Sequence, residues 1–217
     1  MKSMSFFINK ENIKSEESPF ISTHYEYVVK IHIPILPAFS VEYFSLNLGG
    51  TTGMASGNDT IDGTTLIMES EAKLTEDMIA KGAVVTIHYH GIRDYSLLFP
   101  WIEKIELRER LGAFYEESEK ILQQGAWLSF SLMCGAIFEG MLYAKLDYPT
   151  YRNTFYDMIS DAFEQNIIDE RQRNIIHEVR TSRNLVHGNK YQTAYVTRRS
   201  TMDIRITLDS LIKEFSN

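Results

Sequence analysis

Cysteine is almost absent from this sequence, in which Cys134 is the only one among 217 residues. A single cysteine excludes an intramolecular disulfide, and it excludes a zinc site built from several cysteines of one chain. Cys134 lies within the apolar run SLMCGAIF. We therefore expect its side chain to be a small buried hydrophobic group.

The sequence also has little that would direct the chain into or across a membrane. At its N-terminus only Phe6, Phe7 and Ile8 form an apolar cluster, which is too short for the core of a signal peptide. No run approaches the roughly 20 apolar residues that span a bilayer. We expect a soluble, cytoplasmic protein without membrane contacts.

Positive charge is scarce overall but is concentrated in one segment. The net charge is −7, which argues against a surface coated with nucleic-acid-binding charge. Between Glu170 and Arg199, however, seven Lys or Arg residues stand against two acids. A local basic patch on an acidic protein can still attract a phosphate backbone, with an affinity that falls as salt rises.

The first hundred residues predict a small, mostly antiparallel β domain. Residues 1–18 show little pattern, and we expect a loose arm there. The segment 49–63 is rich in Gly, Thr and Asn but lacks the Gly-Lys-Ser/Thr ending of a phosphate-binding loop, so it is predicted to be a connection. Residues 75–81 are predicted to form a helical turn. Runs of β-branched and aromatic residues predict strands over 23–33, 39–48, 64–71 and 83–90.

Four histidines in this region raise the alternative of a metal site. His88 and His90 are two apart on a predicted strand and therefore share one face of it. His24 and His32 lie on another predicted strand. No acidic residue or cysteine stands at a recognisable ligand spacing, so the histidines are expected to be structural or exposed, and no metal is expected.

From residue 101 onward the pattern changes to helices, which predicts an α+β protein with a β-rich domain over 1–100 and a helical bundle over 101–217. Short links between the helices favour an up-and-down arrangement. The second predicted helix is apolar almost all round, so we expect it to be the most buried one. The predicted helices are 106–124, 126–146, 155–166, 169–188 and 200–215.

Glu139 is the one acid within the second predicted helix. A buried carboxylate without a partner is costly, so this side chain is expected to be paired, hydrogen-bonded or protonated. The alternative is that Glu139 lies at an exposed edge of the helix.

The fourth predicted helix, 169–188, has marked ends and two unlike faces. Asp169 suits the N-cap, and Gly188 suits a left-handed residue after the last turn. An apolar face would consist of Ile175, Val179, Ser182 and Val186, with Leu185 at its edge. A continuous polar stripe would consist of Arg173, His177, Arg180, Asn184 and His187, flanked by Arg183.

The helical half resembles the HEPN superfamily of all-helical domains. The resemblance rests on an acidic and aromatic helix followed by an apolar helix with an internal Glu, FYEESEKILQQGAWLSFSLMCGAIFEGML, and on the later helix EVRTSRNLVHG. The superfamily signature is an arginine, four to six residues, then a histidine, often with Asn or Asp after the arginine. Arg180 and His187 have this spacing, although Asn184 follows Arg183 instead, so the sequence leaves open which arginine is the motif residue.

This resemblance implies a metal-independent endoribonuclease that works as a homodimer through the helical domain and needs no cofactor. His187 would be the acid or base, Arg180 would bind phosphate, and Asn184 and Arg183 would assist. A histidine is suited to this proton transfer near neutral pH, and an arginine to a charged phosphate in the transition state. The products would be a 2′,3′-cyclic phosphate and a 5′-hydroxyl. Substrate contacts are expected from Arg173, His177 and Lys190, and Glu139 would orient the site.

Two functions follow from the resemblance, and the sequence leaves both open. The first is an RNA-cleaving effector of the toxin–antitoxin or antiviral-defence type, with an antitoxin or defence protein as partner and the β domain as its sensor. The second is a non-catalytic HEPN module that acts as a dimerisation or nucleotide-binding scaffold. They differ in whether Arg180 and His187 line an open cleft or are held in ion pairs within the chain, for instance to Glu139.

Overall fold

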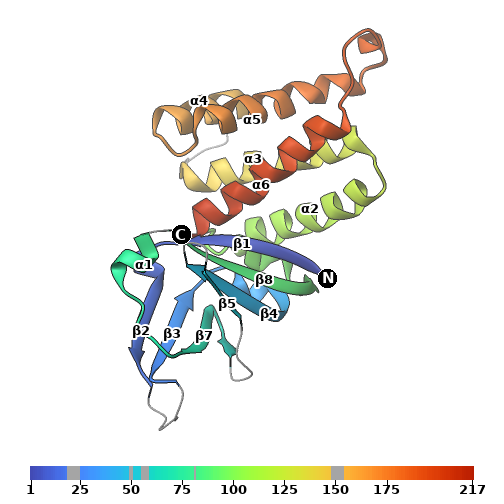
Figure 1. Cartoon of the computed structure of the whole chain (residues 1–217). Coiled ribbons are helices and arrows are strands. Elements are labelled where there is room, and N and C mark those ends of the chain that lie inside the picture. The colour runs from blue at the N-terminus through green and yellow to red at the C-terminus, as the bar shows by residue number, and fades with distance from the viewer. Residues whose placement is uncertain (19–24, 49–50, 55–58, 81, 148–153) are drawn as a thin grey trace. The chain divides into compact units, whose positions relative to one another are not determined.

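The computed structural model describes the chain except for residues 19–24, 49–50, 55–58, 81 and 148–153 (Figure 1). The chain divides into two compact units, Met1–Asp94 and Tyr95–Ser216. The first unit contains antiparallel sheets and the second contains helices. This confirms the predicted α+β class.

The first unit has two antiparallel four-stranded sheets. Alternation of buried and exposed side chains explains the strands, as in β8, where Ala83, Val85, Ile87 and Tyr89 are buried and the residues between them are not. The first sheet has the order β1 (Lys2–Ile8), β8 (Ala83–Ile92), β4 (Phe39–Leu48), β5 (Thr51–Met54). The second has the order β2 (Ile13–Glu17), β3 (Tyr27–His32), β7 (Thr65–Ser70), β6 (Thr60–Asp62).

The predicted loose arm at residues 1–18 is wrong. β1 pairs with β8 along its whole length, and β2 pairs with β3. Burial of Phe6 and Ile8 accompanies this pairing, whereas Phe7 between them is 80% exposed. These strands are short and carry polar residues, so pairing with partners distant in sequence, and not local propensity, makes them strands.

Two further predictions for this unit have mixed outcomes. The helical turn near 75–81 is confirmed as α1 (Glu76–Ala80). The segment 49–63 is more than a connection, because it contains β5 and β6. The predicted strand 23–33 is observed as β3, and its Thr23 and His24 lie outside the described residues.

The second unit contains five α-helices among its described residues, and α3 is central. α3 packs against α2, α4, α5 and α6, as expected for a helix that is apolar all round. A short 3₁₀ turn (Tyr95–Leu98) precedes them. The helices are α2 (Ile105–Gln123), α3 (Trp127–Lys145), α4 (Phe155–Glu164), α5 (Glu170–Ser182) and α6 (Arg198–Ser216).

Two glycines let neighbouring helices approach α3 closely. A Cβ atom added at Gly140 would lie 2.6 Å from Leu111 Cδ2 of α2, and one added at Gly135 would lie 3.1 Å from Val179 Cγ1 of α5. In the described part of the chain, α3 is the one helix long and apolar enough to cross a membrane. Eight of its residues are buried, among them Cys134 as predicted, which is typical of the core helix of a globular soluble protein.

α5 begins as predicted but ends early. Asp169 is the N-cap and forms a capping box with Gln172. The α-helix stops at Ser182 and continues as 3₁₀ turns over Arg183–Val186 and Gly188–Lys190. The hydroxyl groups of the last two helical residues bond back to carbonyls four residues earlier, which is a known cause of bending at helix ends. Gly188 does not adopt the left-handed conformation expected of it.

The buried face of α5 also differs from the prediction. Ile176 is fully buried in place of the expected Ile175, and Val186 is 55% exposed because it lies beyond the α-helix. Val179 and Ser182 are buried as expected. Gln172 is largely buried because it takes part in the capping box and donates a hydrogen bond to Glu214 of α6 at 2.9 Å.

Candidate functional site

Arg183, and not Arg180, forms an ion pair with Glu139, the acidic residue within α3. Arg183 Nη2 donates a hydrogen bond to Glu139 Oε2 at 2.6 Å. Both side chains remain partly exposed, at 43% and 37%. Gly135, one turn earlier on α3, lies beside this pair, since a Cβ there would be in ordinary contact with Arg183 Nε at 3.9 Å. An ion pair in contact with water leaves the guanidinium available to a further ligand.

The helical part of the predicted polar stripe packs against aromatic rings of α4. The arginines lie over rings, a contact favoured by the negative face of the aromatic system, and the ring of His177 packs against another ring, so this part of the stripe is not a free helix face. Arg173 lies 4.1 Å from the Phe163 ring centroid, Arg180 lies 5.2 Å from that of Tyr156, His177 lies 5.3 Å from that of Tyr156, and Arg183 lies 5.3 Å from that of Phe155.

His177 is held as a neutral imidazole by its surroundings. Its pKa is lowered from the ordinary 6.5, first by burial and then by the positive charges of Arg180 and Arg173. The ring therefore presents a donor and an acceptor near neutral pH, but it carries no charge with which to bind phosphate.

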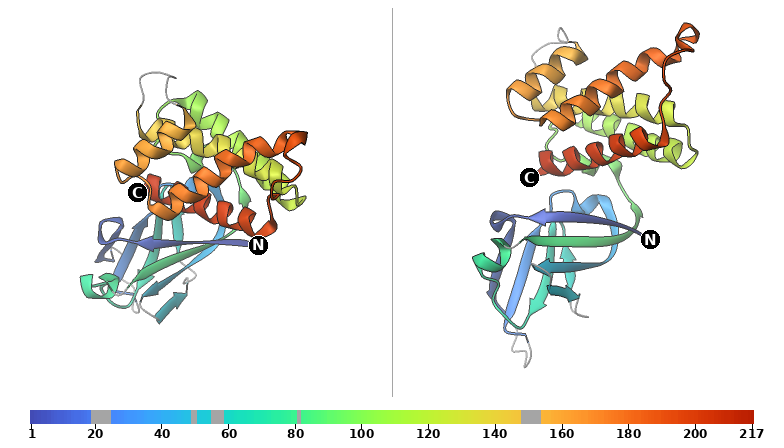
Figure 2. Two further views of the ribbon diagram at one scale, coloured as in Figure 1. Left: turned by 90° about the horizontal axis from the view of Figure 1, so that it is seen from above. Right: turned by 45° about the horizontal axis from the view of Figure 1, so that its top comes forward.

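The remaining predicted site residues lie on the segment that follows α5. We call residues 183–199 the basic loop; it comprises the 3₁₀ turns, the link to α6 and the first two residues of α6. This segment projects from one end of the helical unit (Figures 1 and 2). Asn184, His187 and Lys190 are exposed on it. Their side chains make no hydrogen bond or ion pair with any residue that the structure describes.

Arg198 and Arg199 extend this surface. Both are exposed, and neither has an acidic partner within the described ranges. The basic loop therefore presents His187 together with Lys190, Arg198 and Arg199, which no carboxylate among the described residues neutralises. Such a surface attracts anions, and phosphate above all.

A buried ionic network in the same unit was not predicted. Arg205 of α6 pairs with Asp209 at 2.8 Å and with Glu119 of α2, and it donates to the hydroxyl of Tyr115 at 2.7 Å. The Tyr115 hydroxyl donates in turn to Asp209 at 2.8 Å. Burial, followed by the charge of Asp209, raises the Tyr115 pKa, so the phenol stays protonated. The only sequence signal was the spacing of four that separates Arg205 from Asp209 and Tyr115 from Glu119.

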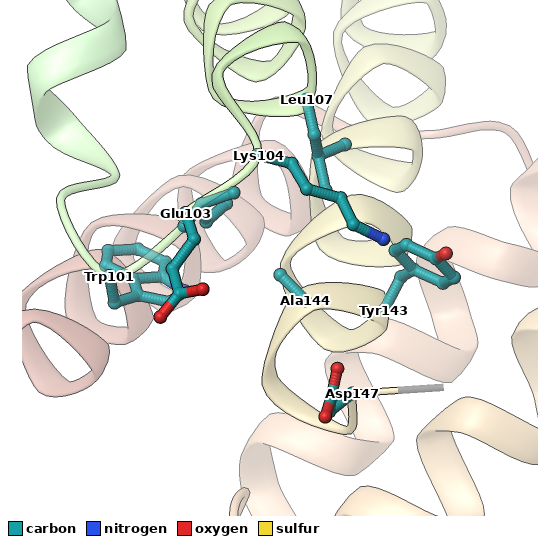
Figure 3. Close-up of a pocket in the computed structure, with 8 residues that line it drawn as sticks. Trp101, Glu103, Lys104, Leu107, Tyr143, Ala144 and Asp147 are labelled. Atoms are coloured by element: carbon teal, nitrogen blue, oxygen red, sulfur yellow. The ribbon is translucent and has the colours of Figure 1, made fainter. Parts of the chain in front are cut away.

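A cavity of about 240 Å³ lies between the start of α2 and the end of α3 (Figure 3). Lys104 lies over the ring of Tyr143, with Nζ 5.5 Å from its centroid. Charges of both signs surround the cavity, and none of the predicted site residues reaches it. Its lining consists of Trp101, Ile102, Glu103, Lys104, Leu107, Tyr143, Ala144 and Asp147.

The histidines of the first unit have local partners. His88 stacks on Tyr43 with ring centroids 4.3 Å apart, His90 pairs with Glu42, and His32 bonds to Thr64. Within the described part of the chain, no group of three or more His, Cys, Asp or Glu side chains is arranged to hold a metal ion. His24 lies outside the described residues.

Comparison with known proteins adds no family to these observations. No protein-family model matches the chain, and no curated protein or solved structure matches it either. The resemblance to the HEPN superfamily therefore stays a prediction from the sequence.

Proposed function

We propose that this protein is a metal-independent endoribonuclease whose site is formed by Arg183, Asn184 and His187. The observation that supports this function best is the exposure of His187, free of any partner among the described residues, four residues after an arginine that is fixed in place by Glu139. Cytoplasmic RNA is the proposed substrate. The unneutralised cations of the basic loop supply its electrostatic attraction.

The proposed reaction uses the nucleophile that RNA itself carries. The 2′-oxygen attacks the adjacent phosphorus while its proton passes to His187, and the bond from phosphorus to the 5′-oxygen breaks. The leaving oxygen takes up a proton and becomes a 5′-hydroxyl, and a 2′,3′-cyclic phosphate remains on the other product. One histidine can fill one of these proton-transfer roles at a time, so we propose that a second copy of the chain supplies the other.

We assign phosphate binding to Arg183 in preference to Arg180. A guanidinium has five N–H donors, and the Glu139 carboxylate accepts a hydrogen bond from one nitrogen of Arg183, Nη2. Exposed donors remain for two phosphate oxygens in a bidentate contact, which is the strongest kind for a charged phosphate. Arg180 instead lies over Tyr156, and its Nε is buried.

The test is cleavage of a mixed RNA population by the purified full chain, with and without EDTA. The wild type is expected to leave cyclic-phosphate ends and to be insensitive to EDTA. His187→Ala is expected to slow cleavage by about 100-fold or more, the usual contribution of a general acid or base. His90→Gln, an exposed histidine of the other unit, is the matched control. Cleavage by His187→Ala at the wild-type rate would contradict the assignment.

One observation favours the second candidate, a non-catalytic helical scaffold. Arg173, His177 and Arg180 are all packed onto rings of α4, so most of the predicted stripe holds two helices together. Under this function the chain would act through homodimerisation or by binding a nucleotide. An absence of cleavage products in every preparation, together with a stable dimer, would favour it over the ribonuclease.

A further inference from the structure

We infer that the basic loop takes single-stranded RNA, with one unpaired base placed in a cavity beside Tyr195. This inference rests on the ribonuclease function proposed above and specifies its substrate class. Three features of the loop carry it: exposed aromatic side chains, an adjoining cavity of suitable size, and a carboxylate in the wall of that cavity.

The aromatic side chains of the loop are left in water. Tyr191 is 81% exposed and Tyr195 is 63% exposed, in a segment that also exposes Lys190, Arg198 and Arg199. Two tyrosines interleaved with cations are the combination that binds single strands, in which bases stack on the rings while the cations follow the phosphates. A duplex offers no free base faces to such rings.

Beside Tyr195 the end of α5 and the loop line an open cavity of about 300 Å³. One planar base fits into a space of this volume with room for water. Leu185 and Val196 give the cavity apolar walls, against which a base can pack while Tyr195 covers it. The remaining lining residues are Glu178, Thr181, Ser182, Thr193, Ala194, Thr197 and Ser200.

Glu178 would make the cavity specific for some bases over others. It is exposed, lines the cavity, and has no ion pair with any described residue. A carboxylate accepts hydrogen bonds and donates none, so it favours bases with an exocyclic amino group. Cytosine carries such a group at the position where uracil carries an acceptor oxygen, and we therefore expect C to be preferred over U.

The experiment measures binding separately from cleavage. Fluorescein-labelled 2′-O-methyl oligonucleotides of about ten nucleotides lack the attacking hydroxyl, and their affinity for the full chain is read by fluorescence anisotropy. Single-stranded oligo-C is expected to bind more tightly than oligo-U and more tightly than a duplex. Tyr195→Ala is expected to weaken the binding of oligo-C by about 10-fold, whereas Tyr195→Phe keeps the ring and the affinity. Tyr43→Ala, at an exposed tyrosine of β4, is the control.

Two further arms keep the outcome independent of protein folding. Abasic sites in the oligonucleotide should weaken binding to the wild-type protein, and Glu178→Gln should remove the preference for C over U. Equal affinity of Tyr195→Ala and wild type, or of duplex and single strand, would overturn the inference. A change in oligomer mass in Tyr195→Ala with unchanged affinity for RNA would overturn it too, and would make this surface an interface between copies.

Failure of the proposed function gives a different result. If wild-type protein binds single strands through Tyr195 but cleaves no RNA, the ribonuclease assignment fails and the binding site stands. If it cleaves RNA and Tyr195→Ala binds normally, the base site fails and the ribonuclease assignment stands.

Discussion

Arg205 and the cations of the basic loop belong to the same helical unit but have opposite surroundings. Arg205 is largely buried and contacts two carboxylates and a phenol. Arg198 and Arg199, at the start of the same helix, are exposed and have no acidic partner in the part of the chain that the structure describes. Within one helix, therefore, one arginine is committed to the fold and two are available to a ligand.

Between these extremes lie Arg173 and Arg180 of α5 and Arg183, which follows the last residue of that helix. Arg173 and Arg180 are half-buried and cover aromatic rings, which neutralise no charge but shield it from water. Arg183 has a carboxylate partner and is still exposed. The comparison teaches that the number of cations in a segment does not measure its capacity for phosphate, because the partner of each cation decides that capacity.

The largest effect is expected where the arginine is buried. Arg205→Met should destabilise the helical unit by about 3–5 kcal/mol, because it leaves the carboxylates of Glu119 and Asp209 without their shared cation. Urea unfolding followed by far-UV circular dichroism measures this loss. Arg199→Met, on the exposed side of the comparison, should change the free energy of unfolding by about 0.5 kcal/mol or less. Equal losses of stability in Arg205→Met and Arg199→Met would contradict the distinction between a buried and an exposed arginine.

A smaller effect is expected at the aromatic platform. Tyr156 lies under both His177 and Arg180, so Tyr156→Ala should cost about 1–2 kcal/mol of stability through the loss of two ring contacts. Tyr156→Phe retains the ring and should be close to wild type in the same urea titration. A large loss in Tyr156→Phe would mean that the hydroxyl, and not the ring, is the group that matters.

The smallest effect is a pH dependence that arises from His177. Its pKa is lower in the folded protein than the ordinary 6.5, so the unfolded chain binds a proton more readily. The contribution of neutral His177 to the free energy of unfolding is therefore complete above pH 6.5, and it is lost as the pH falls through the lowered pKa. Wild type should lose more stability than His177→Phe between neutral and mildly acidic pH. Parallel pH profiles of the two proteins would contradict the lowered pKa.

Parts of the fold could be predicted because their signal is local. β4 has the predicted bounds 39–48, since alternating side chains mark a strand without knowledge of its partners. Asp169 begins α5 because its carboxylate bonds within the first turn. The central place of α3 follows from its apolar circumference.

The failures have non-local causes. Residues of β1 and β2 become strands through pairing with β8 and β3, which their own sequences do not show. The periodicity of α5 runs on past Ser182, while the hydrogen bonds change to a tighter turn. For the same reason the predicted stripe is divided: its first three residues pack on α4, and its last two lie in the basic loop. The Arg205 network joins helices that are about 90 residues apart in sequence, so the spacing of four within each helix could not reveal that the two pairs meet.

Cys134 gives the helical unit an internal reporter. The thiol is fully buried in α3, and burial raises its pKa above the ordinary range, so it is unreactive toward alkylating reagents in the closed state. Since the chain has no other cysteine, each labelled molecule records an opening of the helical core and nothing else. The labelling rate, measured with and without RNA, would therefore show whether RNA bound to the basic loop changes how often the core around Cys134 opens. This measurement needs no mutation and no added probe.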